Sequence, residues 1–163
     1  MLALRSAIFA LLLPGTVTIL IPWFIAYRNH AAQFSHWTLW HCAGLVPLAV
    51  GAAILLWCIW DFATIGRGTL APVDPPTQLV VRGPYRYVRN PMYVGVVLIL
   101  LGEAALFQSV MMLACSVVFV LAVHCFVVLY EEPALQRQFG ESYQAYRRHV
   151  RRWWPRVPDK PDA

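Results

Sequence analysis

The sequence predicts an all-α, multi-pass membrane protein: a bundle of about four transmembrane helices followed by an amphipathic helix at the membrane interface. Of its 163 residues, 60% are hydrophobic and only 13% are charged, whereas soluble domains average about 45–50% apolar and about 25% charged residues. The mean hydropathy of +0.57 excludes disorder and an ordinary soluble domain, because one small core cannot bury so many apolar side chains. Long stretches without a charged residue are the third observation.

Four segments are apolar enough to cross a bilayer. No Asp, Glu, Lys or Arg lies between Arg5 and Arg28, Arg28 and Asp61, Arg89 and Glu103, or Glu103 and Glu131. Because a spanning helix needs about 20 mostly apolar residues, we expect spans at residues 6–27, 40–60, 91–107 and 109–130. The third is the shortest, and Gly102-Glu103 near its end predicts a tight helical hairpin into the fourth. A cleaved signal peptide is the alternative for the first, but no small-x-small cleavage site follows it and further spans do.

The basic residues predict the orientation. With four alternating spans, twelve of the thirteen Lys and Arg residues fall on one side and only Arg28 on the other. The positive-inside rule therefore places both termini in the cytoplasm. The net charge of +5 is thus a topology signal, and we expect no nucleic-acid partner, because the basic residues sit at membrane edges beside aromatic ones such as Trp153 and Trp154.

The cysteines predict neither a metal site nor a disulfide framework. All four fall inside the expected spans and none forms a C-x-x-C pair, so we interpret them as small apolar packing residues. They are Cys42, Cys58, Cys115 and Cys125.

The first segment that carries chemistry is LVVRGPYRYVRNPMYVG, residues 79–95, which follows a proline-rich stretch. Asn90 followed by Pro91 is typical of a helix N-cap with proline at the first helical position. Exposed N–H groups and the positive end of the helix dipole meet there, which favours an anion site. Three arginines lie close by in the sequence: Arg82, Arg86 and Arg89. The alternative is a capped helix with an arginine cluster that serves orientation only.

The second such segment is Glu131-Glu132-Pro133. We expect Pro133 to end the fourth span and Glu132 to leave the helical region of backbone space, because it precedes a proline. Two carboxylates at a helix C-terminus near the hydrocarbon boundary are unfavourable without a cation. The partner is either a nearby arginine or a cationic ligand, and adjacent helical positions, about 100° apart, need not share it.

Downstream, apolar residues recur at helical spacing and predict an interfacial amphipathic helix. They are Leu135, Phe139, Tyr143, Tyr146, Val150 and Trp153.

Three further polar residues have open roles. His124, two turns before Glu131, is either functional or a neutral histidine bonded to a neighbouring helix. We expect Glu103 to cap the hairpin loop. Asp61 either pairs with Arg67 or faces a ligand pocket at the end of the second span.

RGPYRYVRNPMYVG, a hydrophobic hairpin and EEPALQRQFGESYQAYRR together closely resemble the isoprenylcysteine carboxyl methyltransferases, and phospholipid methyltransferases share the pattern. The combined motif is GPY-x-x-x-R-x-P-x-Y-x-G, a Glu-Glu pair and FG-x-x-Y-x-x-Y. The resemblance covers about residues 79–154, the catalytic half of a single domain that we expect over residues 1–163. The two N-terminal spans, within residues 6–60, match only in hydropathy.

The resemblance implies an integral-membrane methyltransferase that uses S-adenosylmethionine and releases S-adenosylhomocysteine. The cofactor carboxylate would suit the arginine-rich helix start, and its ammonium and sulfonium would suit the Glu pair. The residues implied to bind the cofactor are Arg82, Gly83, Pro84, Tyr85, Arg89, Asn90, Pro91, Tyr93, Glu131 and Glu132. The implied catalytic residues are Glu131, Glu132 and Arg137, of which Arg137 would orient an anionic substrate unless it is only a surface arginine of the interfacial helix.

The resemblance favours carboxyl methylation of an isoprenylcysteine-like substrate, with phospholipid-amine N-methylation as the alternative. A carboxylate acceptor needs only orientation by a cation, whereas an amine must first lose a proton to a base. Eukaryotic carboxyl methyltransferases have histidine where this chain has Asn90, and relatives of bacterial type share the Asn-Pro version, which implies a bacterial inner membrane. Two other classes stay open: a nicotinamide-dependent membrane reductase, since sterol reductases resemble this C-terminal arrangement, and a non-catalytic membrane protein.

Overall fold

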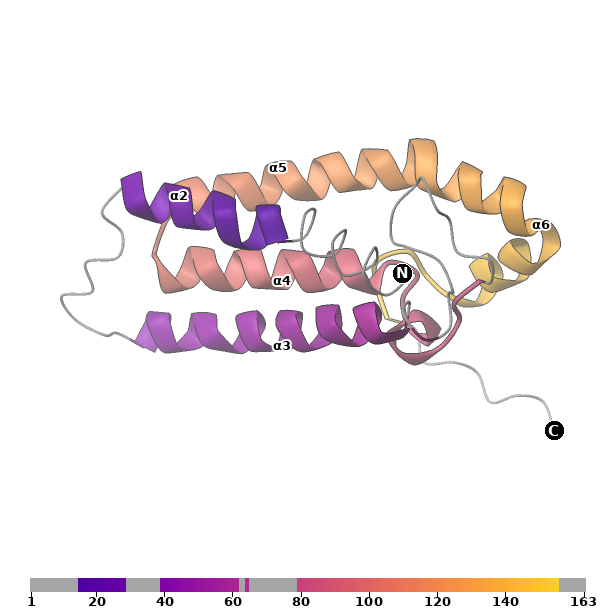
Figure 1. The fold of residues 1–163 in the computed structure, drawn as a ribbon, viewed down its shortest axis with the longest axis horizontal. Coiled ribbons are helices and arrows are strands. Elements are labelled where there is room, and N and C mark those ends of the chain that lie inside the picture. Colours follow the sequence, from indigo (N-terminus) through magenta and orange to yellow (C-terminus); the bar gives the residue numbers. More distant parts are fainter. Residues whose placement is uncertain (1–14, 29–38, 62–63, 65–78, 156–163) are drawn as a thin grey trace.

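The computed structural model describes residues 15–28, 39–61, 64 and 79–155, and the regular elements in these ranges are helices (Figure 1). The all-α prediction is therefore confirmed for the described part of the chain. The proline-rich stretch, Arg67 and the first half of the expected first span lie outside the described residues. In chain order the elements are η1 (Thr16–Leu20), α2 (Ile21–Arg28), α3 (Leu39–Asp61), η3 (Gly83–Arg86), α4 (Pro91–Leu106), α5 (Val110–Phe126), η4 (Val127–Glu131) and α6 (Glu132–His149).

Two helices are long and apolar enough to cross a membrane: His41–Asp61 and Val110–His149. Thr16–Ile25 and α4 are apolar but shorter, so the expected count of four spans is not confirmed. The helix Val110–His149 has 40 residues, and at 1.5 Å per residue it is about twice as long as the ~30 Å hydrocarbon core is thick. Its apolar first half, which ends at Tyr130, is about as long as this core is thick.

Helices α3 and α4 run antiparallel and pack closely along their length (Figure 1). Two pairs of glycines meet at this contact, Gly44 with Gly102 and Gly51 with Gly95. A Cβ atom on any of the four would lie only 2.5–2.9 Å from the backbone oxygen of its partner. Small residues allow such close approach between membrane helices. This contact was not predicted from the sequence.

The predicted hairpin between α4 and α5 is confirmed. Phe107 N–H donates to the Glu103 carbonyl (2.8 Å), and the Ser109 hydroxyl caps α5 by accepting from Met112 N–H (3.3 Å). The expectation that the Glu103 side chain caps this loop stays a prediction. Its Oε2 is buried and has no hydrogen-bond partner among the described residues.

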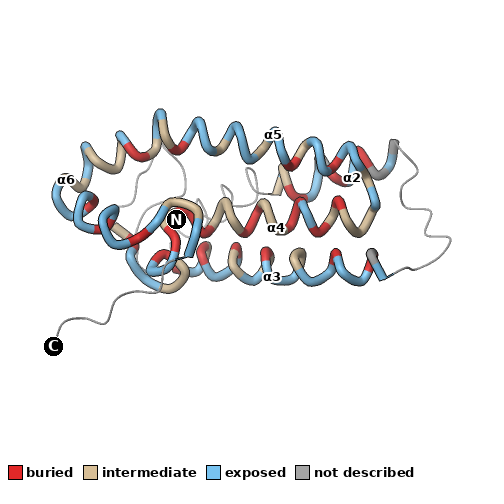
Figure 2. The backbone as a smooth tube through the Cα atoms, turned by 180° about the vertical axis from the view of Figure 1, so that it is seen from behind, coloured by how far each residue is buried: buried red, intermediate tan, exposed pale blue. Residues whose placement is uncertain are grey.

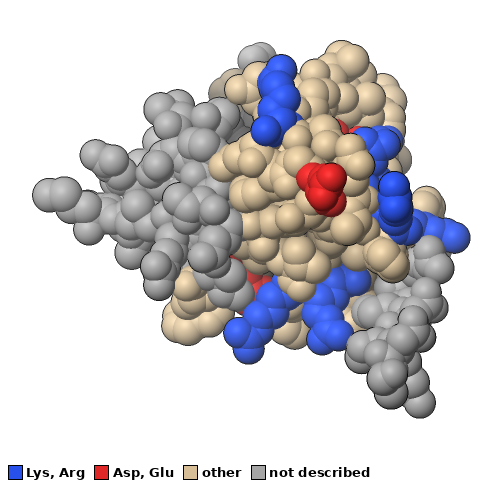
Figure 3. Space-filling model, turned by 90° about the vertical axis from the view of Figure 1, so that its right-hand side faces the viewer, with Lys and Arg blue, Asp and Glu red and all other residues tan. Residues whose placement is uncertain are grey.

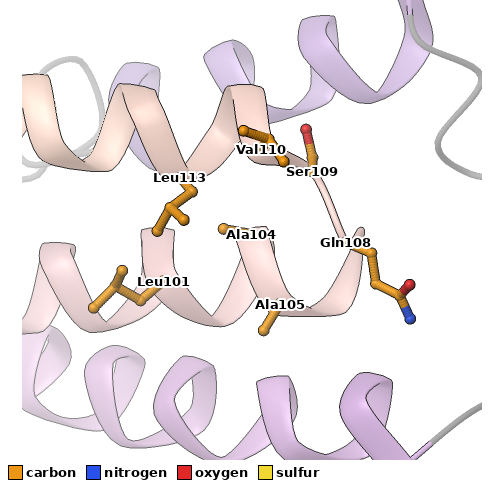
Figure 4. A pocket seen from close by; sticks show the side chains of 7 residues that line it. All are labelled: Leu101, Ala104, Ala105, Gln108, Ser109, Val110 and Leu113. Atoms are coloured by element: carbon orange, nitrogen blue, oxygen red, sulfur yellow. The ribbon is translucent and has the colours of Figure 1, made fainter.

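A small cavity of about 260 Å³ lies between the two arms of this hairpin. Figure 4 shows its mostly apolar lining, with Leu101 and Leu113 facing each other and Ser109 at the turn. The hairpin is at the end of the bundle opposite α6 (Figure 1).

The expected helix break at Pro133 does not occur. Glu132 is helical (φ −62°, ψ −43°), and the π-helical turn η4 joins α5 to α6 without interruption. Proline is tolerated in the first turn of a helix, and Pro133 occupies such a position in α6. The chain changes direction later, at Gly140, whose φ of 52° and ψ of −122° are not helical.

The predicted apolar face of α6 is confirmed, but it packs on the protein rather than lying free at the interface. Tyr143, Tyr146 and Val150 are buried, with Leu79 from the motif loop among their neighbours. Because α6 bends at Gly140, it curls under the end of the bundle (Figure 1). Figure 2 shows the buried positions between α3 and α4 and on the inner side of α6, whereas much of α5 is exposed, as expected for a lipid-facing helix.

Candidate functional site at the α6 end of the bundle

The turn Gly83-Pro84-Tyr85 is anchored on α3 and α6. Gly83 has a φ of 55°, and a Cβ atom there would overlap with the Asp61 carboxylate at the end of α3. Tyr85 is buried, its carbonyl accepts a hydrogen bond from the Tyr146 hydroxyl (2.7 Å), and burial raises the pKa of its phenol well above the usual value. The motif residues at this turn thus fix the loop between two helices.

Asp61 lies at this same end of the bundle. It is 6% exposed, and its Oδ2 atom is buried and has no hydrogen-bond partner among the residues that the structure describes. Of the two expected roles, pairing with Arg67 concerns a residue outside the described part of the chain. The contact with Gly83 brings the Asp61 carboxylate against the motif loop.

Asn90 and Pro91 begin α4 at the expected positions, but Asn90 does not cap the helix with its side chain. Its Nδ2 instead donates to the Arg152 carbonyl (3.3 Å). The Asn90 side chain thus bonds to the segment after α6 and not to the first turn of α4.

Of the three arginines in the motif, only Arg89 turns into the protein. Arg82 and Arg86 are exposed, whereas the Arg89 side chain is 10% exposed and places Nη1 3.2 Å from Glu132 Oε1. The three arginines are close in the sequence but differ in their surroundings, because the 3-10 turn η3 leaves Arg86 in solvent and the extended Arg82 precedes it.

The two acids of the Glu-Glu pair have separate partners, as their directions on the helix predict. Arg152 binds Glu132 in a bidentate pair, with Nε 2.7 Å from Oε1 and Nη2 2.9 Å from Oε2. Glu131 points to α4, where the Tyr93 hydroxyl donates to its Oε2 (3.0 Å). Their position differs from the expected one, since the helix continues past both acids instead of ending there.

These partners give the two carboxyl groups opposite electrostatics. Burial raises the pKa of Glu131, more than the Tyr93 hydrogen bond lowers it. Burial also acts to raise the pKa of Glu132, but the hydrogen bond from Arg152 and the charge of Arg89 lower it below the usual range. Glu132 therefore pairs with two guanidinium groups. Among the described residues, the hydrogen-bond partner of Glu131 is the neutral phenol of Tyr93.

The chain after α6 completes this cluster. Arg89 N–H donates to the Arg151 carbonyl (2.9 Å), and the Trp153 indole N–H donates to His124 Nδ1 (3.1 Å). His124 is thus bonded within the protein, as its second interpretation has it, although the partner follows α6 rather than lying on a neighbouring helix. This bond requires Nδ1 to be unprotonated.

Arg152 was not identified from the sequence. Twenty residues and the bend at Gly140 separate it from Glu132, and no helical spacing links two residues so placed. The only signal is that the basic tail holds more arginines than orientation requires. Basic side chains gather around this end of the molecule (Figure 3).

Arg137 lies on α6 outside the cluster. Its side chain is exposed, and within the described part of the chain no hydrogen bond or ion pair connects it to Glu131 or Glu132. Its expected contact with an acceptor stays a prediction.

Comparison with known proteins gives two matches. A family model described as phospholipid methyltransferase matches residues 39–142, from the start of α3 to the middle of α6. An uncharacterized protein of Haemophilus influenzae is 32% identical over 62 residues, which are 38% of this chain and 98% of that relative. No solved structure matches the chain.

Proposed function

The chain belongs to the phospholipid methyltransferase family, and from this membership we propose that it transfers a methyl group from S-adenosylmethionine to a lipidic acceptor in the membrane. Family membership and the two long apolar helices support a membrane protein. The observation that carries the proposal is at the α6 end of the bundle. There Arg89 shares the carboxylate of Glu132 with Arg152, and Glu131 is bonded to an uncharged phenol.

The residues present fit the cofactor, which carries a carboxylate, an ammonium and a sulfonium. Arg89 Nη1 lies in the ion pair with Glu132, but Arg89 Nε is buried and has no hydrogen-bond partner among the described residues, so this guanidinium can still donate to an anion. Glu131 is a half-buried acid whose hydrogen-bond partner, the Tyr93 hydroxyl, carries no charge. Buried charges in proteins are normally paired, and one ligand with both signs would satisfy the two.

We assign the roles accordingly. Arg89 holds the carboxylate of the cofactor, and Glu131 faces its cationic groups. The remaining motif residues form the wall around it: Arg82, Gly83, Pro84, Tyr85, Asn90, Pro91 and Tyr93. When bound, S-adenosylmethionine supplies a sulfonium methyl group for in-line displacement, with S-adenosylhomocysteine as the product. The chain contributes mainly by holding the reactants in line, an effect worth about 7–11 kcal/mol in favourable cases.

Two acceptor chemistries are compatible with these residues. For an isoprenylcysteine-like carboxylate, which needs no base, Arg137 would orient the acceptor. For a phospholipid amine, Glu131 would accept the proton, and burial supports this role because it raises the pKa of Glu131 and makes the carboxylate a stronger base.

We further propose a four-span topology in a bacterial inner membrane, with both termini and the site on the cytoplasmic side. The basic side chains around the α6 end support this orientation (Figure 3). The α4–α5 hairpin would then face the opposite side.

Inverted and right-side-out membrane vesicles that contain the protein test function and sidedness together. S-adenosylmethionine with a labelled methyl group is charged and reaches only the outer face of a vesicle. We expect label in the lipid fraction of inverted vesicles alone, as a base-labile ester for a carboxylate acceptor or a stable N-methyl group for an amine. Label only in right-side-out vesicles would overturn the topology. Absence of label in both preparations, with oxidation of added NADPH, would replace the methyltransferase with a reductase.

A further inference from the structure

Residues 150–153, here called the C-terminal clasp, tie together three parts of the fold. Val150 is buried with Tyr143 and Tyr146. The next residues contact the start of α4, where Arg89 N–H donates to the Arg151 carbonyl and Asn90 to the Arg152 carbonyl. The clasp ends on α5, where the Trp153 indole meets His124.

Each residue of the clasp thus has its own anchor, and together these anchors favour a permanent part of the site over a lid. The clasp also lies beyond residues 39–142, the range that the family model matches. No role is assigned to it by that match.

Arg152 contributes the charge of the clasp. Its bidentate contact occupies both carboxylate oxygens of Glu132, at 2.7 and 2.9 Å, and the Glu132 side chain is only 9% exposed. Arg89 approaches the same carboxylate with one nitrogen, at 3.2 Å. Two guanidinium groups therefore share one carboxylate, which leaves one positive charge in excess at this place.

The free donor of that excess charge is Arg89 Nε, which is buried and forms no hydrogen bond among the described residues. Arg89 Nη1 lies in the ion pair with Glu132. Without Arg152, the Glu132 carboxylate would lack its main partner. A buried carboxylate that loses its partner is strongly unfavourable. Arg89 would therefore turn to bind both carboxylate oxygens of Glu132.

We propose that Arg152 is a positioning residue, which neutralises Glu132 and thereby keeps the Arg89 guanidinium available for the carboxylate of an S-adenosyl ligand. This inference rests on the proposed function. It separates the two acids of the motif: Glu132 belongs to the arginine cluster, and Glu131 alone faces the cationic groups of the ligand.

The test compares two ligands that differ only in the carboxylate, S-adenosylmethionine and its decarboxylated form, by calorimetric titration of the full chain in detergent. Arg152→Gln should weaken binding of S-adenosylmethionine about tenfold or more, as expected when a charge-assisted hydrogen bond is lost. Binding of the decarboxylated ligand should change by less than about threefold on the same scale. Arg151→Gln is the matched control, because only the backbone of this exposed neighbour contacts the site.

A second variant separates positioning from loss of structure. In Arg152→Gln/Glu132→Gln the acid that would draw Arg89 away is neutral, so we expect most of the affinity for S-adenosylmethionine to return. If Arg152→Gln fails to fold, Arg152→Lys, which keeps the charge but loses the fork, should show a smaller loss confined to the same ligand.

Equal losses for both ligands, no loss for either, or no recovery in the double variant would each overturn the role of Arg152. A parent protein that binds neither ligand would overturn the proposed function itself, which is a distinct result.

Discussion

Glu131 and Glu132 are adjacent acids of one motif, yet their surroundings give them different chemistry. The helix directs Glu132 toward Arg89 and Arg152, and directs Glu131 toward the Tyr93 hydroxyl on α4. An acid between two guanidinium groups stays ionised, whereas a half-buried acid beside a neutral phenol can still take a cationic partner. The structure therefore points to Glu131 as the acid with capacity for a ligand.

This difference predicts a pH effect on stability. Because its pKa is lowered in the folded protein, Glu132 stabilises the fold above the ordinary glutamate pKa of about 4.3, and this contribution is lost as the pH falls through the lowered value. Between pH 7 and pH 3 the parent should therefore lose more free energy of unfolding than Glu132→Gln, which lacks the titration. Unfolding in detergent, followed by circular dichroism at both pH values, measures the difference.

The matched control is Glu141→Gln, since Glu141 is an exposed acid on the same helix. It should keep the pH dependence of the parent. A parent and a Glu132→Gln variant that lose equal stability on acidification would show that the ion pairs of Glu132 contribute nothing to the fold.

At the scale of single residues, the sequence predicts which side chains form the candidate site. It predicts the contacts between them less well. The motif residues Arg89, Tyr93, Glu131 and Glu132 come together as expected. Arg152 could not be predicted, because its contact depends on the path of the chain after Gly140.

Some features that arrange the helices can be predicted from the sequence, and others cannot. The sequence predicts the hairpin between α4 and α5 from Gly102-Glu103 near the end of the third apolar run. The structure adds Ser109, which caps α5 after the turn. The continuous helix through Pro133 was not predicted, because the expectation assumed ordinary α geometry, whereas the π-helical turn η4 brings Pro133 into the first turn of α6.

The contact between α3 and α4 predicts which substitutions the bundle cannot accept. A Cβ atom at Gly51 would lie 2.5 Å from the Gly95 oxygen and 2.8 Å from Ile99 N, both backbone atoms. Gly51→Ala should therefore force the helices apart and destabilise the protein by about 1–3 kcal/mol, as overpacking typically does. Thermal unfolding in detergent measures the loss.

Gly15→Ala provides the comparison, because a Cβ atom at Gly15 meets nothing within 4 Å. We expect this variant to unfold like the parent. If the two variants have the same stability, the glycine pairs do not set the distance between α3 and α4.

For the whole molecule, the chain concentrates its chemistry at one end. The motif loop, the Glu-Glu pair and the C-terminal clasp meet at the α6 end, while the hairpin forms the other (Figure 1). The expected all-α class and the division into apolar helices and a polar C-terminal segment after Tyr130 follow from composition and from the stretches without charged residues. The number of spans does not, because α4, with 16 residues, is shorter than the usual spanning length of about 20.

The central claim is that this end of the bundle binds an S-adenosyl ligand, and calorimetric titration of S-adenosylhomocysteine into the purified protein tests it most directly. We expect saturable binding of S-adenosylhomocysteine to the parent and no binding of NADPH. Glu131→Gln should bind S-adenosylhomocysteine more weakly by about 1.5–3 kcal/mol, because it loses a charge-assisted contact. Saturable binding of NADPH without binding of S-adenosylhomocysteine, or equal affinity of parent and Glu131→Gln for S-adenosylhomocysteine, would contradict the central claim.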